Sequence, residues 1–338
     1  MSQYAIYYWY SLSDDHFAFS SKLDILKKHI FSTQQIFQSK CSEYNLLTGI
    51  ASLFGIVALW SFIPSLIKLL LPTFDPFVLG FLRLILATFV YLGLFVYNRH
   101  TFAEIKFSWW YVLGGAALGI NYLLYALSLS HTTASAGCLI VQVQYVTLAA
   151  LATIVLKERL TLLKSLGMAV VLLGVLIIVV YKDGMGEIIA PQYLRGNILM
   201  VFAGFGWGIY ALANKALAPR LSSAMILFPI FLVSSVVAYI PAHSSMIEMS
   251  MPTIDSIIIV IFLGVVCSGG SFLFLSEAMK RLSAVLVGSA TALAPIAQIS
   301  IANYLLDEPI TIAVVAGGIV IISGVGCMVY SERSESSQ

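Results

Sequence analysis

The chain has 338 residues, of which 60% are hydrophobic and only 10% charged, and its mean hydropathy is +0.95. Water-soluble domains carry about a quarter charged residues, so this composition excludes a compact soluble fold and indicates a chain that is solvated mostly by lipid. The formal charge of +2 is too small to indicate a nucleic acid as partner.

The first 45 residues are amphiphilic, unlike the rest of the chain. They have no basic start followed by an apolar core and a cleavage site, which excludes a signal peptide. Residues 21–40 fit an interfacial helix, with a disordered tail as the alternative. We predict that residues 1–45 form a cytoplasmic tail.

Apolar stretches then follow one another to residue 330. A helix needs roughly 20 apolar residues to cross the hydrocarbon core, and only helices and closed barrels satisfy their backbone groups in lipid. Nothing here alternates like barrel strands. The sequence therefore predicts an all-α integral membrane protein with ten spans: 46–70, 76–97, 109–128, 132–156, 161–181, 195–217, 222–242, 253–277, 283–306 and 310–330.

Basic residues set the orientation. If the N-terminus is cytoplasmic, the inner segments hold twelve Lys and Arg residues and the outer loops hold only two, Lys182 and Arg195. The inner set is Lys22, Lys27, Lys28, Lys40, Arg99, Lys106, Lys157, Arg159, Arg220, Lys280, Arg281 and Arg333. We predict a multi-pass protein of the inner or plasma membrane with both termini in the cytoplasm, the last eight residues (331–338) forming a short tail.

The chain also repeats itself. WSFIPSLIK at 60–68 matches WGIYALANK at 207–215 in the spacing of tryptophan and lysine, 147 residues further on. Glu158, Gly167 and Gly174 likewise meet Glu308, Gly317 and Gly324, 150 residues further on. The repeats are predicted at 46–181 and 195–330. Five spans each is an odd number, so the second repeat is inverted, as in many transporters with alternating access.

With these features the sequence resembles the drug/metabolite transporter superfamily, in its EamA-like branch, over residues 46–330. The resemblance is carried by the tryptophan-to-lysine stretches, the Ala126–Ala136 segment, and the segments LKERLTLLKSLG and LDEPITIAVVAGG. It implies ten helices in two five-helix repeats and small organic solutes such as amino acids, other metabolites or drugs, often exported. Related branches exchange nucleotide sugars or phosphorylated sugars. In the family pattern prolines interrupt spans four and nine; Pro295 fits, but Tyr145 stands at the matching position.

Polar and aromatic side chains inside the spans are the candidates for contact with solute. Gln142 and Gln144 lie about 200° apart on a helix, so at most one should face a central cavity. Asn121, Tyr125, Gln144 and Asn303 are further polar candidates. The predicted substrate-binding residues are Trp60, Tyr122, Gln142, Tyr145, Trp207, Tyr210, Phe272 and Gln298. The alternatives are interhelical hydrogen bonds for the amides and plain packing for the aromatic rings.

Charged residues within the spans are candidates for gating or coupling: Lys68, Arg83, Lys215 and Glu277. For the two lysines, snorkelling of the ammonium group to the headgroups is the favoured alternative. Arg83 has no sequence-local partner and needs a carboxylate, a carbonyl or water. For Glu158 and Glu308 we expect helix capping and pairing with nearby Lys or Arg.

We therefore predict a secondary transporter that moves a small organic metabolite, with export as the expected direction. An exchanger of anionic solutes such as nucleotide sugars or organic phosphates is the alternative, and a non-transporting receptor or scaffold is a second. No enzyme motif is present. The four cysteines occur singly without a Cys/His pair, so no metal and no cofactor are expected. The expected partners are the bilayer and the solute, with either a proton or an exchanged solute for coupling; the sequence does not identify the solute.

Overall fold

A computed structural model describes residues 47–157, 161–180, 191–247, 251–281 and 294–336. The chain divides into two compact units, residues 1–49 and 50–338, and the description here concerns the second. The predicted tail, including the predicted helix at 21–40, lies outside the described residues. At the other end, the last helix continues to Ser336, through most of the predicted tail at 331–338.

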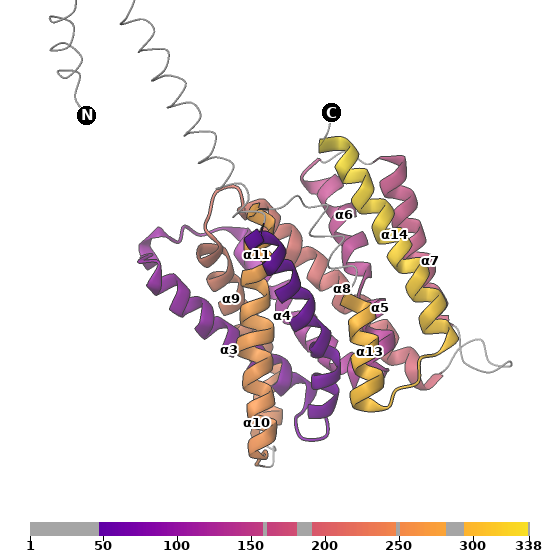
Figure 1. Ribbon diagram of the computed structural model, residues 1–338. Helices are drawn as coiled ribbons and strands as arrows, with labels where there is room; N and C mark the ends of the chain where they lie inside the picture. Colours follow the sequence, from indigo (N-terminus) through magenta and orange to yellow (C-terminus); the bar gives the residue numbers. More distant parts are fainter. Residues whose placement is uncertain (1–46, 158–160, 181–190, 248–250, 282–293, 337–338) are drawn as a thin grey trace, which may run out of the picture. The chain divides into compact units, whose positions relative to one another are not determined.

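Every regular element that the structure describes is helical (Figure 1). The first half contains a helix at Leu47–Leu70, α3 (Pro76–Tyr97), η1 (Phe102–Glu104), α4 (Trp109–Leu129), α5 (Ala134–Ile140), α6 (Val143–Val155) and α7 (Leu162–Val180). The second half contains α8 (Pro191–Leu217), α9 (Ser223–Ile247), α10 (Ile254–Ile261), η2 (Phe262–Gly270), α11 (Ser271–Arg281), α13 (Ala294–Leu306) and α14 (Ile312–Ser336).

Seven helices among the described residues are long and apolar enough to cross a bilayer. They coincide with predicted spans one to four and six to eight. The other three predicted spans coincide with shorter apolar helices at Leu162–Ile178, Ala294–Leu306 and Ile312–Met328. Of the predicted span 283–306, residues 283–293 lie outside the described residues. The helical fold class is confirmed, and the described helices are compatible with ten spans.

Several helices begin where the sequence supplies a cap. Asp75 precedes α3, and its carboxylate accepts hydrogen bonds from the N–H groups of Phe77 (2.8 Å) and Val78 (3.4 Å), with Pro76 at the first helical position. The hydroxyl of Ser108 accepts from the N–H of Trp110 at the start of α4. Such caps satisfy N–H groups that have no partner within the helix.

Two spans are not regular α-helices. The fourth span is interrupted between α5 and α6, where Gln142 and Tyr145 donate N–H bonds three residues back, to Leu139 and Gln142. The eighth contains the π-helical segment η2, which ends at Gly270. A β-carbon at Gly269 would lie 3.1 Å from the side chain of Val90, so this glycine packs against α3. π-helical segments often occur at functional sites.

Glycines allow the two halves to approach closely. A β-carbon at Gly115 would lie 2.8 Å from the carbonyl oxygen of Ile230 on α9, and one at Gly119 would lie 2.9 Å from that of Ser234. Gly206 on α8 approaches the carbonyl oxygen of Ala117 on α4 equally closely, at 2.8 Å. Close packing between α4, α8 and α9 therefore joins the two halves at the centre of the bundle.

The two halves also meet through residues that correspond in the repeat. The helices α7 and α14 lie side by side (Figure 1). Gly167 packs on Gly324 and Gly174 packs on Gly317, so the later residue of one helix meets the earlier residue of the other and the helices run antiparallel. The hydroxyls of Thr88 and Ser235, 147 residues apart, are 2.9 Å from each other.

Candidate solute-binding cavity

A cavity of about 90 Å³ lies between the halves. This is several times the roughly 10–15 Å³ that one water molecule needs. Its lining comes from seven helical elements and is mostly aromatic or amide-bearing. The lining residues are Trp60, Ile63, Arg83, Asn121, Tyr122, Tyr125, Val141, Gln142, Gln144, Tyr145, Trp207, Phe272, Ala294 and Gln298.

One wall of the cavity is aromatic. The rings of Trp60 and Trp207, which correspond in the repeat, meet edge to face with centroids 6.5 Å apart. Phe272 lies 6.5 Å from Trp60, and Tyr145 lies 6.0 Å from Trp207. Edge-to-face contact orients the rings, so this wall is built from both halves.

Tyr210 is the one predicted substrate-binding residue that is not in the cavity lining. Its ring is fully buried behind the wall, 5.5 Å from Phe272 and 6.1 Å from Trp207. Its hydroxyl accepts a hydrogen bond from Asn214. The residue lies one helical turn beyond Trp207 on α8, where the side chain packs against the aromatic wall from behind.

Two glutamines have a fixed amide orientation at the cavity. The Nε2 of Gln142 donates to the carbonyl oxygen of Cys138 and that of Gln298 donates to the carbonyl oxygen of Trp60, both at 2.9 Å. Because these partners only accept hydrogen bonds, the amide nitrogens are on the carbonyl side. The Oε1 atoms of both glutamines are buried and have no hydrogen-bond partner among the described residues.

Gln142 and Gln144 both line the cavity, so the expectation that at most one would do so is wrong. That expectation assumed an uninterrupted helix with about 100° per residue. The chain instead turns at Val141 and Gln142, between α5 and α6, and the turn changes the direction of the side chains that follow. A proline at this point of the sequence would have predicted the break in the helix, but the sequence has none there.

Arg83 on α3, a predicted gating or coupling residue, also lines the cavity. Its side chain is buried, with the guanidinium carbon 4.5 Å from the centroid of the Tyr122 ring. Its only hydrogen bond within the described part of the chain is a long one, 3.4 Å from Nη2 to the hydroxyl of Ser268, and its Nε has no partner there.

The structure adds apolar lining that polarity could not reveal: Ile63, Val141 and Ala294. Ile63 follows Trp60 by three residues, and helical periodicity alone would have placed it on the same face. Asn121, Tyr125 and Gln144 also line the cavity and had been candidates for their polarity. Asn303 does not; it is exposed, and its side-chain nitrogen donates to the carbonyl oxygen of Glu308.

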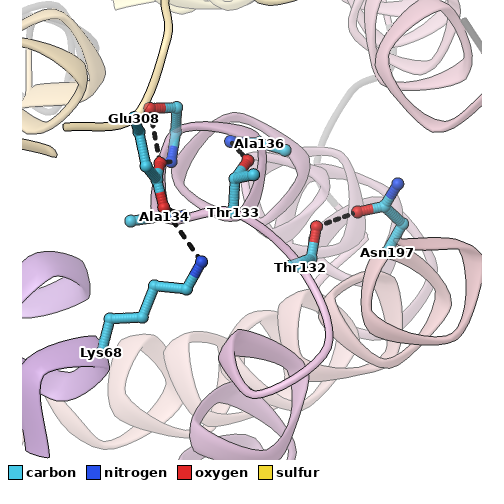
Figure 2. Close-up of polar contacts among 8 residues, drawn as sticks. Lys68, Thr132, Thr133, Ala134, Ala136, Asn197 and Glu308 are labelled. Carbon is cyan, nitrogen blue, oxygen red and sulfur yellow. Dashed lines mark hydrogen bonds and ion pairs between the residues drawn. The ribbon is translucent and has the colours of Figure 1, made fainter. Parts of the chain in front are cut away.

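A charged cluster lies at one end of α5 (Figure 2). We call Lys68, Ala134, Ser135 and Glu308 the Glu308 cluster. The carboxylate of Glu308 accepts from the ammonium of Lys68 (3.0 Å) and from the N–H groups of Ala134 (2.8 Å) and Ser135 (3.0 Å). The hydroxyl of Ser135 donates to it as well. Glu308 thus caps a helix of the first half and pairs with a lysine of the first helix.

Glu308 does cap a helix and pair with a lysine, but the expectation of nearby partners is wrong, because both partners are more than 170 residues away in the chain. The ammonium of Lys68 binds Glu308, which replaces the snorkelling interpretation for this lysine. Glu158, its counterpart in the first repeat, lies outside the described residues. Asp307 and Lys157, which precede the two glutamates, both have a positive φ, 52° and 57°.

The environment of Glu308 favours its ionised form. Burial by itself raises the pKa of this carboxyl group, but the hydrogen bonds from Ala134 and Ser135 and the charge of Lys68 together outweigh it and bring the pKa below its ordinary value of 4.5. A carboxylate with a lowered pKa in the folded state adds stability above the unfolded pKa and loses it as the pH falls through the folded value.

We therefore expect the stabilisation from Glu308 to be fully present at pH 7 and to decline only below pH 4.5. The measurement is the difference in thermal unfolding midpoint between the wild type and Glu308→Gln in detergent, recorded from pH 7 downwards. The difference should stay constant down to about pH 4.5 and then shrink. A difference that grows on acidification would contradict the lowered pKa.

Lys215 and Glu277 do not line the cavity. Lys215 is exposed near the end of α8, and Glu277 is half-buried on α11. Their gating or coupling roles stay predictions. Among the described residues no group of three or more His, Cys, Asp or Glu side chains is arranged to hold a metal ion.

Comparison with known proteins shows that this chain is similar to membrane transporters. The EamA-like transporter family matches residues 47–180 and again residues 194–330. An uncharacterized transporter of Archaeoglobus fulgidus is 26% identical over 77% of this chain and 89% of its own length. The uncharacterized inner membrane transporter YhbE of Escherichia coli K12 is 24% identical over 70% of this chain and 74% of its own. One crystal structure, 18% identical, superposes with a TM-score of 0.61 over 86% of this chain and 99% of that one.

Proposed function

The chain belongs to the EamA-like transporter family of the drug/metabolite transporter superfamily, and is thus a multi-pass membrane transporter; from this we propose that it carries a small organic metabolite by alternating access, with export as the direction. The observation that carries the proposal is the cavity between the two halves, which combines an aromatic wall with buried polar groups that lack partners among the described residues. Solute sites are typically apolar cavities with a few placed polar groups.

Alternating access needs two mirrored halves, and the contacts support an inverted repeat. The contact between Gly167 and Gly324 becomes the contact between Gly317 and Gly174 when the halves are exchanged. Such self-complementary contacts are what a twofold axis produces. Because α7 and α14 run antiparallel, that axis lies across the helices and in the plane of the membrane. Trp60 with Trp207, and Thr88 with Ser235, are further pairs of this kind.

The Glu308 cluster supports closure on one side of the cavity. Lys68 follows Trp60 by two helical turns, and Ala134 precedes Val141 by about two turns, so both lie about 10–12 Å along their helices from cavity-lining residues. Glu308 joins these two elements of the first half to the loop between α13 and α14 of the second. From the distribution of Lys and Arg we infer that this side faces outward and that both termini are cytoplasmic, in the inner membrane.

The test is reconstitution of the full chain into liposomes and counterflow of labelled amino acids, organic anions, nucleotide sugars and cationic drugs. Counterflow of one class supports a carrier. If that class is nucleotide sugars or organic phosphates, the exchanger alternative holds. Neither binding nor flux of any class would leave a receptor or scaffold. Flux without saturation would indicate a channel.

Cysteine probes test the two-sided access directly. In a chain without its four native cysteines, Trp60→Cys and Trp207→Cys should react with a membrane-impermeant thiol reagent from both sides in turn, because both side chains line the cavity. Solute should change the two rates in opposite directions. Phe62→Cys is the matched control, since Phe62 is on the same helix but exposed to the exterior of the bundle. Labelling from one side only, with or without solute, would count against alternating access.

A further inference from the structure

The π-helical segment η2 connects the cavity to α3. It covers Phe262–Gly270 of span eight, and Phe272, two residues beyond its end, lines the cavity and contacts Trp60. Its glycines bring it close to α3, where a β-carbon at Gly264 would lie 2.6 Å from the side chain of Leu86. π-helices are rare and occur mostly as single-turn bulges. A π-helical segment of nine residues therefore needs support from outside its own backbone.

Three successive carbonyl oxygens of η2 accept hydrogen bonds from hydroxyl groups. Tyr91 on α3 is fully buried, and its hydroxyl donates to the carbonyl oxygens of Ser268 (3.1 Å) and Gly269 (2.8 Å). The hydroxyl of Ser271 donates to the carbonyl oxygen of Cys267. Inside an ordinary helix such carbonyls are bonded to N–H groups of the same helix. Tyr91 therefore supplies a donor from a second helix, near the point where the π-helical segment ends.

The same segment also contacts the arginine of the cavity. The Nη2 of Arg83 donates to the hydroxyl of Ser268 at 3.4 Å, and Arg83 lines the cavity. Ser268 is 1% exposed. Its carbonyl oxygen is bonded to Tyr91 and its hydroxyl to Arg83, which lie about two turns apart on α3. Ser268 thus links the lining of the cavity to the contact that supports η2.

We propose that Tyr91 and Ser268 are positioning residues for transport: they hold η2 in its π-helical form, and this form places Phe272 in the aromatic wall of the cavity. This inference rests on the proposed function, which gives the cavity its role. A contact favours one form of a segment only if the other form does not make it. Return of η2 to an α-helix would shift the residues after it by at least one position, which is about 100° around the axis. Ser268 would then turn away from Tyr91, and Phe272 would turn away from the wall.

The first test measures the position of residue 272 without any solute. In the full chain, with its four native cysteines replaced by alanine, Phe272→Cys is labelled in proteoliposomes with a maleimide, with and without Tyr91→Phe. Loss of the hydroxyl should slow the labelling about 2- to 10-fold, because one hydrogen bond changes an equilibrium by about that factor. Ser268→Ala should slow it by a smaller factor, since the bond that it removes is long, at 3.4 Å. An unchanged rate in Tyr91→Phe would overturn the proposal.

Hydrogen exchange of the backbone amides gives a second measurement on the chain with its native cysteines. Tyr91→Phe should change the exchange of residues 262–272 and leave that of α4 unchanged, because only η2 changes its hydrogen bonds. Tyr111→Phe is the matched control: Tyr111 is also a buried tyrosine of the same hydrophobic cluster, and it does not line the cavity. A purely structural Tyr91 would lower the unfolding midpoint and leave both the labelling of position 272 and the local exchange unchanged.

Counterflow of labelled amino acids, organic anions, nucleotide sugars and cationic drugs in the same proteoliposomes separates this inference from the proposed function. For the class that is transported, Tyr91→Phe should raise the half-saturating concentration. Transport with an unchanged half-saturating concentration overturns the inference and keeps the carrier. Slower labelling of position 272, in a chain that transports none of the four classes, keeps the positioning of Phe272 by Tyr91 and counts against the carrier.

Discussion

Gly324→Ala should destabilise the protein by about 1–3 kcal/mol, because the added methyl group overpacks the contact between α7 and α14. A β-carbon at this position would lie 2.7 Å from the backbone nitrogen of Val171 and 2.8 Å from the carbonyl oxygen of Gly167. These are backbone atoms, so no rotamer change can relieve the contact. The helices must separate, and the equivalent contact between Gly174 and Gly317 would be disturbed with them.

Gly326→Ala is the matched control on the same helix. No atom lies within 4 Å of its β-carbon position. Alanine is favoured over glycine within a helix by about 0.8–1 kcal/mol, so this variant should be neutral or slightly more stable. Unfolding can be followed through the thiols of Cys138 and Cys267, which are buried in the folded state. Equal midpoints for Gly324→Ala and Gly326→Ala would mean that α7 and α14 do not meet at these glycines.

The sequence predicts the helices well because a segment that spans the lipid must be apolar, long enough to cross it, and able to satisfy its own backbone hydrogen bonds. Length and apolar composition place the seven long spans, and the offset of 150 residues predicts that Gly167 and Gly174 correspond to Gly317 and Gly324. The repeat also assigns corresponding positions, such as Trp60 and Trp207, to one central space. These features depend on periodicity, which is visible in a single sequence.

The details of the cavity depend on contacts between segments far apart in the chain. The break at Val141 and Gln142 carries no proline, so helical geometry misplaces Gln144. Tyr210 is as aromatic as Trp207, and only packing shows that it lies behind the wall. Glu308 has no local signal that it caps α5 rather than the start of its own helix. Tertiary contacts determine where these side chains lie and which helix they cap, and local sequence patterns do not reveal such contacts.

Glu308→Ala should release the closed side of the cavity and expose it to the outside. The change removes an acceptor of four hydrogen bonds, leaves the ammonium of Lys68 without its carboxylate, and uncaps α5. The Lys68 ammonium is partly exposed, so removing its carboxylate together with the acceptor of the Ala134 and Ser135 N–H groups costs about 1–3 kcal/mol. If closure depends on this cluster, the equilibrium between closed and open shifts by about 5- to 150-fold. The reaction of Trp60→Cys with an impermeant reagent from outside should accelerate accordingly, and counterflow should slow.

Two further variants, Lys68→Gln and Glu104→Ala, serve as comparisons for Glu308→Ala. Lys68→Gln should have a smaller effect, since the Ala134 and Ser135 donors still hold Glu308, and its ammonium is partly exposed, which weakens the pair. Glu104→Ala should have none, because Glu104 pairs with His100 in the exposed connection after α3. A cluster that only stabilised the fold would lower the unfolding midpoint in Glu308→Ala and leave the side of labelling unchanged. If labelling of Trp60→Cys from outside becomes faster while labelling from inside does not, Glu308 acts in closure. Only a shift of the equilibrium between the two access states would raise one labelling rate without raising the other.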